Sequence, residues 1–182
     1  MVSYDTFHFD DLLQVNAVNL DQLTETYSNS FYGDYMIKWP EYQEIVRHPC
    51  GLVMGYVLGK VEGEKQNWHG HVSAVTVAPQ FRRIGLGETL MNRLEQTSEK
   101  IHNAYFVDLF VRRSNKVAEH MYNRLGYTVY RTVLGYYQGG SGPLKEEDAL
   151  DMRKALPRDK ERIKSSVIPL TRPIKPHELE WH

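Results

Sequence analysis

The sequence has a single cysteine, Cys50, among its 182 residues. No disulfide can form within the chain, which excludes the small secreted domains that disulfides hold together. Asn-x-Ser/Thr glycosylation sites are also missing, and the first residues lack the basic and apolar stretches of a secretory signal peptide. These absences favour a reducing compartment, and we expect a cytoplasmic protein.

Long apolar runs and a charge excess are missing as well. No uninterrupted apolar stretch approaches the roughly 20 residues that a membrane helix needs. The chain has 22 basic and 23 acidic residues and a net charge of −1, so its overall charge favours neither nucleic acid nor an anionic membrane as a partner. Hydrophobic residues make up 41% of the chain and charged residues 25%, as is typical of a globular protein.

The order of strand and helix patterns predicts an α/β fold, a single domain with a mixed central β-sheet flanked by helices. Two short helices are expected within residues 1–32, joined by a turn near 19–24. We expect the domain to cover residues 1–157, and the polar, proline-containing residues 158–182 to form an extended C-terminal tail. The strands are predicted at 42–49, 51–61, 68–78, 105–111, 127–134 and 149–156.

Two further helices are predicted in the second half of the chain. One follows the loop at 82–87, and its leucines recur on one face. The other runs to Leu125, with Ser114 or Asn115 as its cap and Gly126 as its C-terminal stop.

The loop at 82–87 has the parts of an anion-binding site. Gly85 and Gly87 allow backbone N–H groups to approach an anion without a Cβ atom in the way. The helix N-terminus adds unpaired N–H groups and a partial positive charge, and Arg82 and Arg83 add formal charge. This combination suits a diphosphate; the alternative is a tight turn with solvated arginines.

Two common phosphate-binding motifs do not fit this loop. The dinucleotide motif requires a third glycine where the chain has Leu90, and the P-loop motif requires Gly-Lys-Ser/Thr. The pattern Arg82-x-x-Gly85-x-Gly87, after a strand that ends in Val-x-Pro, instead resembles the R/Q-x-x-G-x-G/A motif of the GNAT superfamily of N-acetyltransferases. The predicted order of elements is also that of this family.

The resemblance implies a GNAT-type domain that uses acetyl-CoA as its co-substrate. His69-x-His71 offers two metal ligands, but no third is evident in the sequence, and we expect no metal. The residues that would bind the pyrophosphate and the pantetheine arm of acetyl-CoA lie in and before the loop. They are Val75, Val77, Arg82, Arg83, Gly85, Leu86 and Gly87.

Asn115 and Tyr122 lie seven residues apart, which places them on one face of the second predicted helix. The GNAT resemblance implies that both residues contact acetyl-CoA and take part in catalysis. Tyr122 would protonate the leaving thiolate, and Asn115 would lie near the coenzyme or the acceptor. The alternatives are a core tyrosine and a helix cap. The amine would attack the thioester directly, because Cys50 has no nucleophile motif around it.

Stretches spread over residues 5–157 resemble one branch of the superfamily, the catalytic chains of NatB-type N-terminal acetyltransferases. This resemblance implies acetylation of the α-amino groups of nascent chains that begin Met-Asp, Met-Glu, Met-Asn or Met-Gln. It also implies a helical-repeat auxiliary subunit, with the aromatic-rich residues 5–35 as its docking face, and association with the ribosome. The matching stretches are 19–27, 39–42, 54–56, 68–72, 106–112, 126–133 and 151–156.

The same resemblance implies which residues bind the peptide. His71 would hydrogen-bond the side chain of the second peptide residue and is also a catalytic candidate. The alternative for each of these residues is a purely structural role, in the core or at the edge of a hairpin. The chain departs from the expected pattern at Ser73, where threonine is expected, and at Gly135, where glutamate is expected. The implied peptide-site residues are Glu25, Tyr27, His71, Ser73, Tyr136 and Tyr137.

Two other functions stay open at the level of the sequence. One is a different GNAT enzyme, which acetylates lysine side chains or other N-termini. The other is a noncatalytic CoA-binding subunit, which would have no need of Asn115 and Tyr122.

Overall fold

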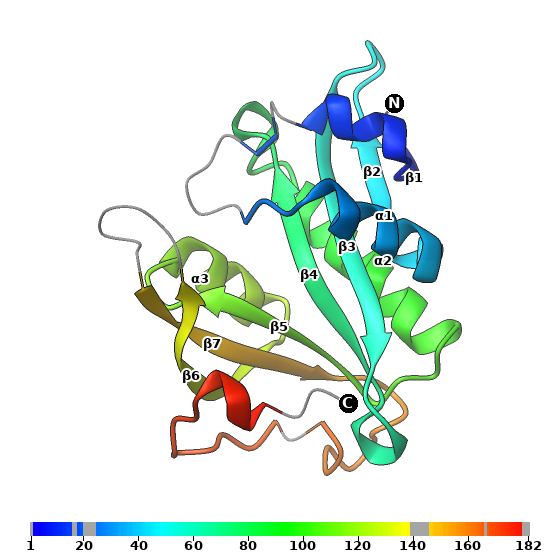
Figure 1. Cartoon of the computed structure of the whole chain (residues 1–182). Helices are drawn as coiled ribbons and strands as arrows, with labels where there is room; N and C mark the ends of the chain where they lie inside the picture. The colour runs from blue at the N-terminus through cyan, green and yellow to red at the C-terminus, as the bar shows by residue number, and fades with distance from the viewer. Residues whose placement is uncertain (1, 16–17, 20–24, 139–145, 166, 180–182) are drawn as a thin grey trace. The chain divides into compact units, whose positions relative to one another are not determined.

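The computed structural model describes residues 2–15, 18–19, 25–138, 146–165 and 167–179. Within them, seven strands are hydrogen-bonded in one sheet in the order β1-β2-β3-β4-β5-β7-β6, and three α-helices accompany the sheet (Figure 1). This confirms the predicted α/β class with a mixed sheet and flanking helices. None of the described helices is both long and apolar enough to span a membrane.

The element bounds follow the predicted order closely from residue 42 onward. The strands are β1 (Ser3–Thr6), β2 (Glu44–Arg47), β3 (Val53–Glu62), β4 (His69–Val77), β5 (Phe106–Arg112), β6 (Thr128–Gln138) and β7 (Glu146–Ala155). The α-helices are α1 (Asn29–Lys38), α2 (Leu86–Lys100) and α3 (Lys116–Arg124).

The residues divide into two compact units, which we describe separately. The first comprises Met1–Val61 and Val72–Ile101, and the second comprises Glu62–His71 and His102–His182. The boundary crosses β4, so the start of that strand belongs to the second unit and the rest to the first.

Close packing of β3 against β4 shapes the first unit. A Cβ atom at Gly55 would lie 2.6 Å from the carbonyl oxygen of Thr76, so glycine is required where the two backbones approach. β2 pairs antiparallel with both β1 and β3. The apolar face predicted for α2 is buried in this unit, at Leu86, Leu90, Met91 and Leu94.

Antiparallel pairing of β5 with β7 and of β7 with β6 builds the second unit. Asp151 of β7 is fully buried, and it accepts hydrogen bonds from Arg131 Nε at 2.8 Å and from Arg153 Nη2 at 3.3 Å. A buried carboxylate needs such partners because desolvation of the charge is costly. Asn115 caps α3, and Gly126 follows that helix with φ +92°, as predicted.

The described residues within 1–32 do not form the two short α-helices predicted there. Ser3–Thr6 form β1, Phe9–Leu13 form a short 3-10 helix, and the α-helix of this region begins only at Asn29. The helical spacing was misleading because Val15 and Val18 are buried outside any described α-helix, and because the partner of β1 is β2, some forty residues away. The predicted turn near 19–24 lies mostly outside the described residues.

The described residues of the tail pack against β6. The N–H of Ile174 donates to the carbonyl of Thr132 at 3.0 Å, and the N–H of Leu134 donates to the carbonyl of Ile174 at 2.8 Å. Ile174 and Leu179 are buried in a cluster with Val133 of β6. The domain boundary after residue 157 stays a prediction.

We expect Ile174→Ala to lower the free energy of unfolding by about 2 kcal/mol, because truncation of a buried isoleucine removes apolar burial and leaves a cavity. The matched control is Ile168→Ala in the same tail, which should change it by less than about 0.5 kcal/mol. Ile174 is 8% exposed and Ile168 is 76% exposed. Urea unfolding measures both, and equal effects would contradict the packing of the tail.

Candidate functional site

The loop before α2 has an unusual backbone conformation. Gly85 has φ +87° and Arg83 has φ +67°, both in the left-handed region. A Cβ atom built at Gly85 would meet no atom within 4 Å, so the space beside it is open. The first N–H groups of an α-helix have no partners inside the helix. Arg82 precedes them, with its Nε donating to the carbonyl of Val77 at 3.0 Å.

The other residues predicted to bind CoA lie on either side of this loop. Leu86 is buried and Gly87 is half-buried in the first turn of α2. Val75 and Val77 are half-buried on the part of β4 that belongs to the first unit. The first unit therefore combines open space, N–H donors and two guanidinium groups beside the end of a strand, which suits a diphosphate.

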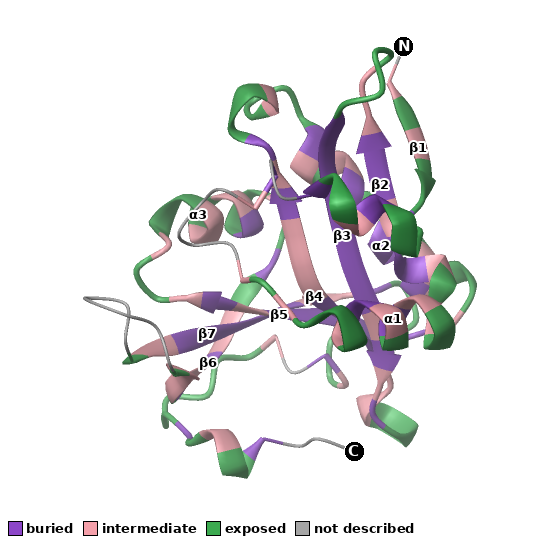
Figure 2. Cartoon of the chain, turned by 45° about the horizontal axis from the view of Figure 1, so that its top comes forward, coloured by how far each residue is buried: buried purple, intermediate pink, exposed green. Residues whose placement is uncertain are grey.

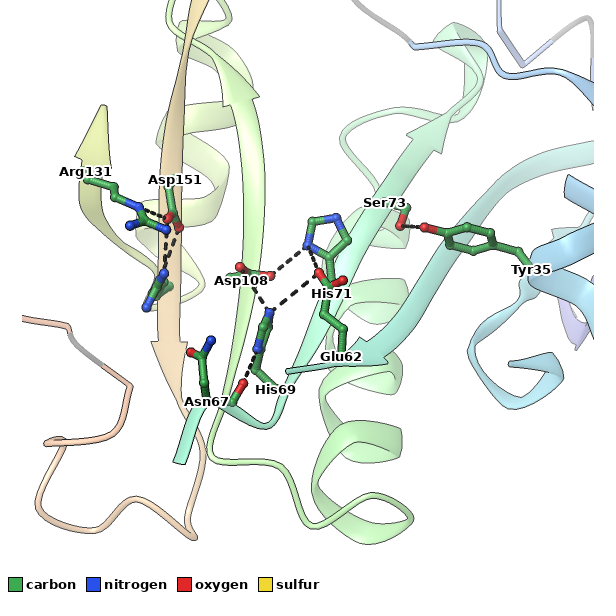
Figure 3. A network of polar contacts seen from close by, with 10 residues as sticks. Tyr35, Glu62, Asn67, His69, His71, Ser73, Asp108, Arg131 and Asp151 are labelled. Atoms are coloured by element: carbon green, nitrogen blue, oxygen red, sulfur yellow. Dashed lines mark hydrogen bonds and ion pairs between the residues drawn. The ribbon is translucent and has the colours of Figure 1, made fainter. Parts of the chain in front are cut away.

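The first unit brings together two of the predicted peptide-site residues, Tyr27 and Ser73. The Tyr27 hydroxyl donates to the Ser73 carbonyl at 2.8 Å. The Ser73 hydroxyl donates to the Tyr35 hydroxyl at 2.9 Å, as Figure 3 shows. Tyr27 also stacks on Phe31 with ring centroids 4.1 Å apart. Glu25 lies two residues before Tyr27 and is half-buried.

Asn115 and Tyr122 both lie on α3 or at its start, in the second unit. The Asn115 side-chain oxygen accepts the Ala118 N–H at 3.1 Å, so this residue is the helix cap. Tyr122 is buried with its ring edge against Tyr127, and its hydroxyl has no hydrogen-bond partner among the described residues. Burial raises the pKa of Tyr122 above its usual value, so this phenol keeps its proton at neutral pH.

His71 belongs to a polar group in the second unit that we call the histidine–carboxylate cluster, made of Glu62, His69, His71 and Asp108 (Figure 3). His71 Nδ1 lies 2.8 Å from Asp108 Oδ1 and 3.7 Å from Glu62 Oε1. His69 Nε2 lies 3.4 Å from Asp108 Oδ2 and 3.7 Å from Glu62 Oε1. The two rings thus share the same two carboxylates.

The cluster holds its charges in a nearly dry environment. Burial disfavours the charged form of His69, but the charge of Asp108 and hydrogen bonds to Asp108, Glu62 and the Asn67 carbonyl raise its pKa to about 10. Burial likewise opposes ionisation of Asp108, yet the two histidines hold its pKa well below the usual range. The cluster therefore contains a buried ion pair at neutral pH.

Sequence reasoning singled out His71 but missed its partners. Asp108 is the one polar residue of the strand predicted at 105–111, and that signal pointed to a buried charge. Glu62, His71 and Asp108 each offer a ligand atom, and these atoms lie within 4.8 Å of one another, so three potential metal ligands meet among the described residues. The 2.8 Å separation of His71 and Asp108 is that of a hydrogen bond.

Tyr136 and Tyr137 lie at a bulge in β6 within the second unit. Tyr136 stacks on Phe110 with centroids 4.7 Å apart, and the Tyr137 hydroxyl donates to the Phe110 carbonyl at 3.1 Å. Gly135, where glutamate was expected, has φ +60° and donates its N–H to Asp148 Oδ1 at 2.9 Å. Glycine suits this left-handed position.

The sequence is similar along its whole length to known N-terminal acetyltransferases. A sequence model of the acetyltransferase (GNAT) family matches residues 14–127. The chain is 65% identical over 185 residues to the "N-terminal acetyltransferase complex ARD1 subunit homolog" of Leishmania donovani, with all of both chains covered. It is 56% identical over 181 residues to the "N-terminal acetyltransferase B complex catalytic subunit NAA20" of Arabidopsis thaliana, covering 100% of this chain and 99% of the other.

A second protein of the same plant allows a direct contrast. The "N-terminal acetyltransferase A complex catalytic subunit NAA10" of Arabidopsis thaliana is 37% identical over 148 residues, covering 81% of this chain and 74% of the other. Of these two subunits from one organism, the B-type subunit is therefore much more similar to this chain than the A-type subunit.

Solved structures of B-type subunits are also similar to the chain. Naa20 of Chaetomium thermophilum in complex with a bisubstrate analogue superimposes with a TM-score of 0.91 at 37% identity, covering 99% of this chain and 100% of the other. A chain of the NatB acetyltransferase complex bound to a bisubstrate inhibitor gives a TM-score of 0.84 at 38% identity, covering 97% and 98%.

The charged state of His69 predicts a pH-dependent stability. Its folded pKa of about 10 lies above the ordinary histidine value of about 6.5. The contribution of His69 is therefore complete below pH 6.5 and is lost as pH rises toward 10. Asp108, whose pKa is low, stays ionised across this window. We expect the free energy of unfolding to fall between pH 7 and 10, and part of the fall to be absent in His69→Gln.

Denaturant unfolding at several pH values measures this effect. His120→Gln is the control, because His120 is exposed on α3. Parallel pH profiles for the wild type and His69→Gln would contradict the assignment of a charged His69.

Proposed function

The chain belongs to the GNAT family and is an acetyl-CoA-dependent N-terminal acetyltransferase of the NatB type, and we propose that it acetylates the α-amino groups of nascent chains that begin Met-Asp, Met-Glu, Met-Asn or Met-Gln. The family membership confirms the resemblance inferred from the loop at 82–87 and the motifs around it. The single observation that carries the proposal is the contrast with the two plant relatives, 56% against 37% identity.

We assign the donor to the first unit. The N–H groups at the start of α2, with Arg82 and Arg83, would bind the pyrophosphate of acetyl-CoA. The backbone of β4 at Val75 and Val77 would hydrogen-bond the pantetheine arm. The open space at Gly85 supports this fit, since a side chain there would stand in front of the helix N-terminus. Acetyl-CoA supplies the acetyl group as a thioester when it is bound.

The acceptor chemistry requires an unprotonated amine and a proton for the leaving thiolate. An α-amino group has a pKa of about 8, against about 10.4 for a lysine side chain, so only a weak base is needed near neutral pH. A backbone N–H of β4 near Val75 would stabilise the oxyanion that forms as the amine attacks. Tyr122 would then donate its proton to the sulfur.

The environment of Tyr122 supports the acid role. Its hydroxyl has no partner among the described residues, and burial keeps it protonated. The side-chain oxygen of Asn115 accepts a hydrogen bond from the Ala118 N–H. Its amide NH₂ would then contact the coenzyme or the acceptor. Both residues belong to the second unit.

The peptide-site residues that the resemblance implies stay our proposal: Glu25, Tyr27, His71, Ser73, Tyr136 and Tyr137. His71 would hydrogen-bond the side chain of the second peptide residue through the ring nitrogen that does not face Asp108. A histidine suits this task because a ring nitrogen can donate a hydrogen bond to a carboxylate, and can either donate to or accept from an amide. Ser73 keeps the hydroxyl of the expected threonine.

We assign the auxiliary subunit to the N-terminal part of the first unit. Phe9, Leu13 and Ile37 are exposed large apolar residues of η1 (Phe9–Leu13) and α1. Figure 2 shows exposed segments along α1. A cavity of about 420 Å³ is lined by residues of both elements, including Gly33 and Met36. Exposed apolar patches of this kind mark protein interfaces, and a helical-repeat subunit fits the proposed NatB assembly. Ribosome association and a cytoplasmic location follow from the nascent-chain substrate.

A peptide panel tests the proposed substrates. We expect kcat/KM for Met-Asp and Met-Asn peptides to exceed that for Ser- and Ala-starting peptides and for internal lysine by at least about tenfold, which corresponds to about 1.4 kcal/mol. Mass spectrometry of the acetylated products measures this with and without the auxiliary subunit. Preference for lysine or for the small N-terminal residues would contradict the substrate assignment while leaving the GNAT enzyme in place.

Substitution of Tyr122 tests the acid role. We expect Tyr122→Phe to lower kcat by about 10² or more, as loss of a general acid does, while the Kd for acetyl-CoA changes by less than about twofold. Tyr127→Phe is the matched control, because Tyr127 is a second buried tyrosine of the same unit. Pre-steady-state acetyl transfer and calorimetry give the two quantities, and equal losses in both would exclude the acid role.

A further inference from the structure

The C-terminal tail lies along the outer edge of β6. β6 is the last strand in the sheet order, and the tail forms a parallel bridge with it between Val133 and Ile174. The N–H of Leu170 also donates to the carbonyl of Tyr130 at 2.6 Å. Figure 1 shows this part of the tail, in orange and red, beside β6. Such pairing covers backbone groups that an edge strand would otherwise expose.

Local contacts fix the last described turn of the tail. Glu178 belongs to the 3-10 helix η7 (Pro176–Glu178) and accepts the Lys175 N–H at 2.8 Å. The same carboxylate forms an ion pair with Arg172. Leu179 follows directly and is buried, at 8% exposure. The turn therefore brings an apolar side chain out of a polar segment and into the second unit.

The buried residues of the tail contact the aromatic side chains of the second unit. Ile174 and Leu179 form a buried cluster with Val133 of β6 and Ala149 of β7. Three half-buried rings pack against this cluster, and they are those of Phe110, Tyr136 and Tyr137. The tail and the tyrosine pair of β6 therefore share one apolar cluster.

Pairing between β6 and β7 is irregular where the tyrosines lie. Between the register pairs Val133–Ala149 and Tyr137–Glu147, β6 has more residues than β7. Gly135, inside this bulge, has φ +60°. A bulge interrupts the regular hydrogen bonds of a sheet. Side-chain packing therefore contributes more here than elsewhere in β6 to how the tyrosines are held.

Contacts with β5 act on the same two rings. Tyr136 stacks on Phe110, and the Tyr137 hydroxyl donates to the Phe110 carbonyl. The Arg112 guanidinium lies 4.1 Å from the centroid of the Tyr137 ring. The two tyrosine rings meet edge to face, with centroids 5.0 Å apart. A displacement of one ring would therefore be transmitted to the other.

We propose that the C-terminal tail positions the peptide site, with Leu179 and Ile174 as positioning residues that hold the Tyr136–Tyr137 pair in its binding conformation. The inference rests on the proposed function, in which the two tyrosines contact the peptide. A site that is already ordered loses less conformational entropy when its ligand binds, so the tail increases affinity for the peptide. Among the described residues, none of those predicted to bind acetyl-CoA belongs to this cluster.

Replacement of Leu179 tests this role, with kcat and KM for a Met-Asp peptide and the Kd for acetyl-CoA as the readouts. We expect Leu179→Ala to raise KM by about fivefold or more, because the tyrosine pair loses its support. The other two quantities should change by less than about twofold. Leu179→Met, which conserves the side-chain volume, should restore KM. Leu170→Ala is the matched control, because Leu170 is 47% exposed in the same tail.

A double-mutant cycle with Tyr136→Ala shows whether Leu179 acts through the tyrosine pair. Leu179→Ala should raise KM less in the Tyr136→Ala background than in the wild type, because the ring that it supports is already gone. Independent effects that simply multiply would overturn the proposal. Circular dichroism checks that each variant is folded at the assay temperature. If Leu179→Ala is unfolded there, Leu179→Val removes less of the side chain and should give the same pattern with a smaller increase in KM.

The outcomes separate this inference from the function on which it rests. A wild-type chain that does not acetylate the Met-Asp peptide would contradict the proposed function itself. An active wild type whose KM is unchanged by Leu179→Ala would leave that function standing and overturn this inference. Equal losses in kcat, peptide affinity and acetyl-CoA affinity would also overturn it, because they would indicate a general structural role.

Discussion

The buried carboxylate of Asp108 constrains which residues can lie beside it in the second unit. It lies in the middle of β5 between apolar residues of the strand, and the cost of desolvation requires positive partners within contact distance. His69 supplies that charge and His71 lies within hydrogen-bond distance of the carboxylate. The two histidines are two positions apart at the start of β4 and so on one face of the strand. The start of β4 therefore belongs with β5, although the rest of that strand belongs to the first unit.

The loop before α2 shows a second constraint, in the backbone. A non-glycine residue such as Arg83 adopts a left-handed conformation at a cost of about 1 kcal/mol or more. Two left-handed residues, Arg83 and Gly85, redirect the chain so that α2 begins immediately after an exposed turn. Such strain persists where the surrounding structure requires it, and here its consequence is an open helix N-terminus flanked by arginines.

Local signals predicted much of this fold, and long-range pairing explains the rest. The periodicity of α2, the cap at Asn115 and the glycine after α3 are read within one or two helical turns, and each was predicted correctly. β1 was not predicted, and the structure of the tail stayed open, because the strands they contact, β2 and β6, are distant in sequence. The histidine–carboxylate cluster draws on three separate strands, so the sequence could show only the odd polar residue of β5 and the His-x-His pair.

The environments of Tyr122 and His69 show that the neighbours of a buried group decide which of its forms is favoured. Tyr122 is buried without a charged partner, which favours its neutral form and preserves a proton for donation. His69 is equally enclosed, but its carboxylate neighbours outweigh desolvation and favour the cation. A fold that separates these two environments can keep a neutral phenol and a charged imidazole at the same pH.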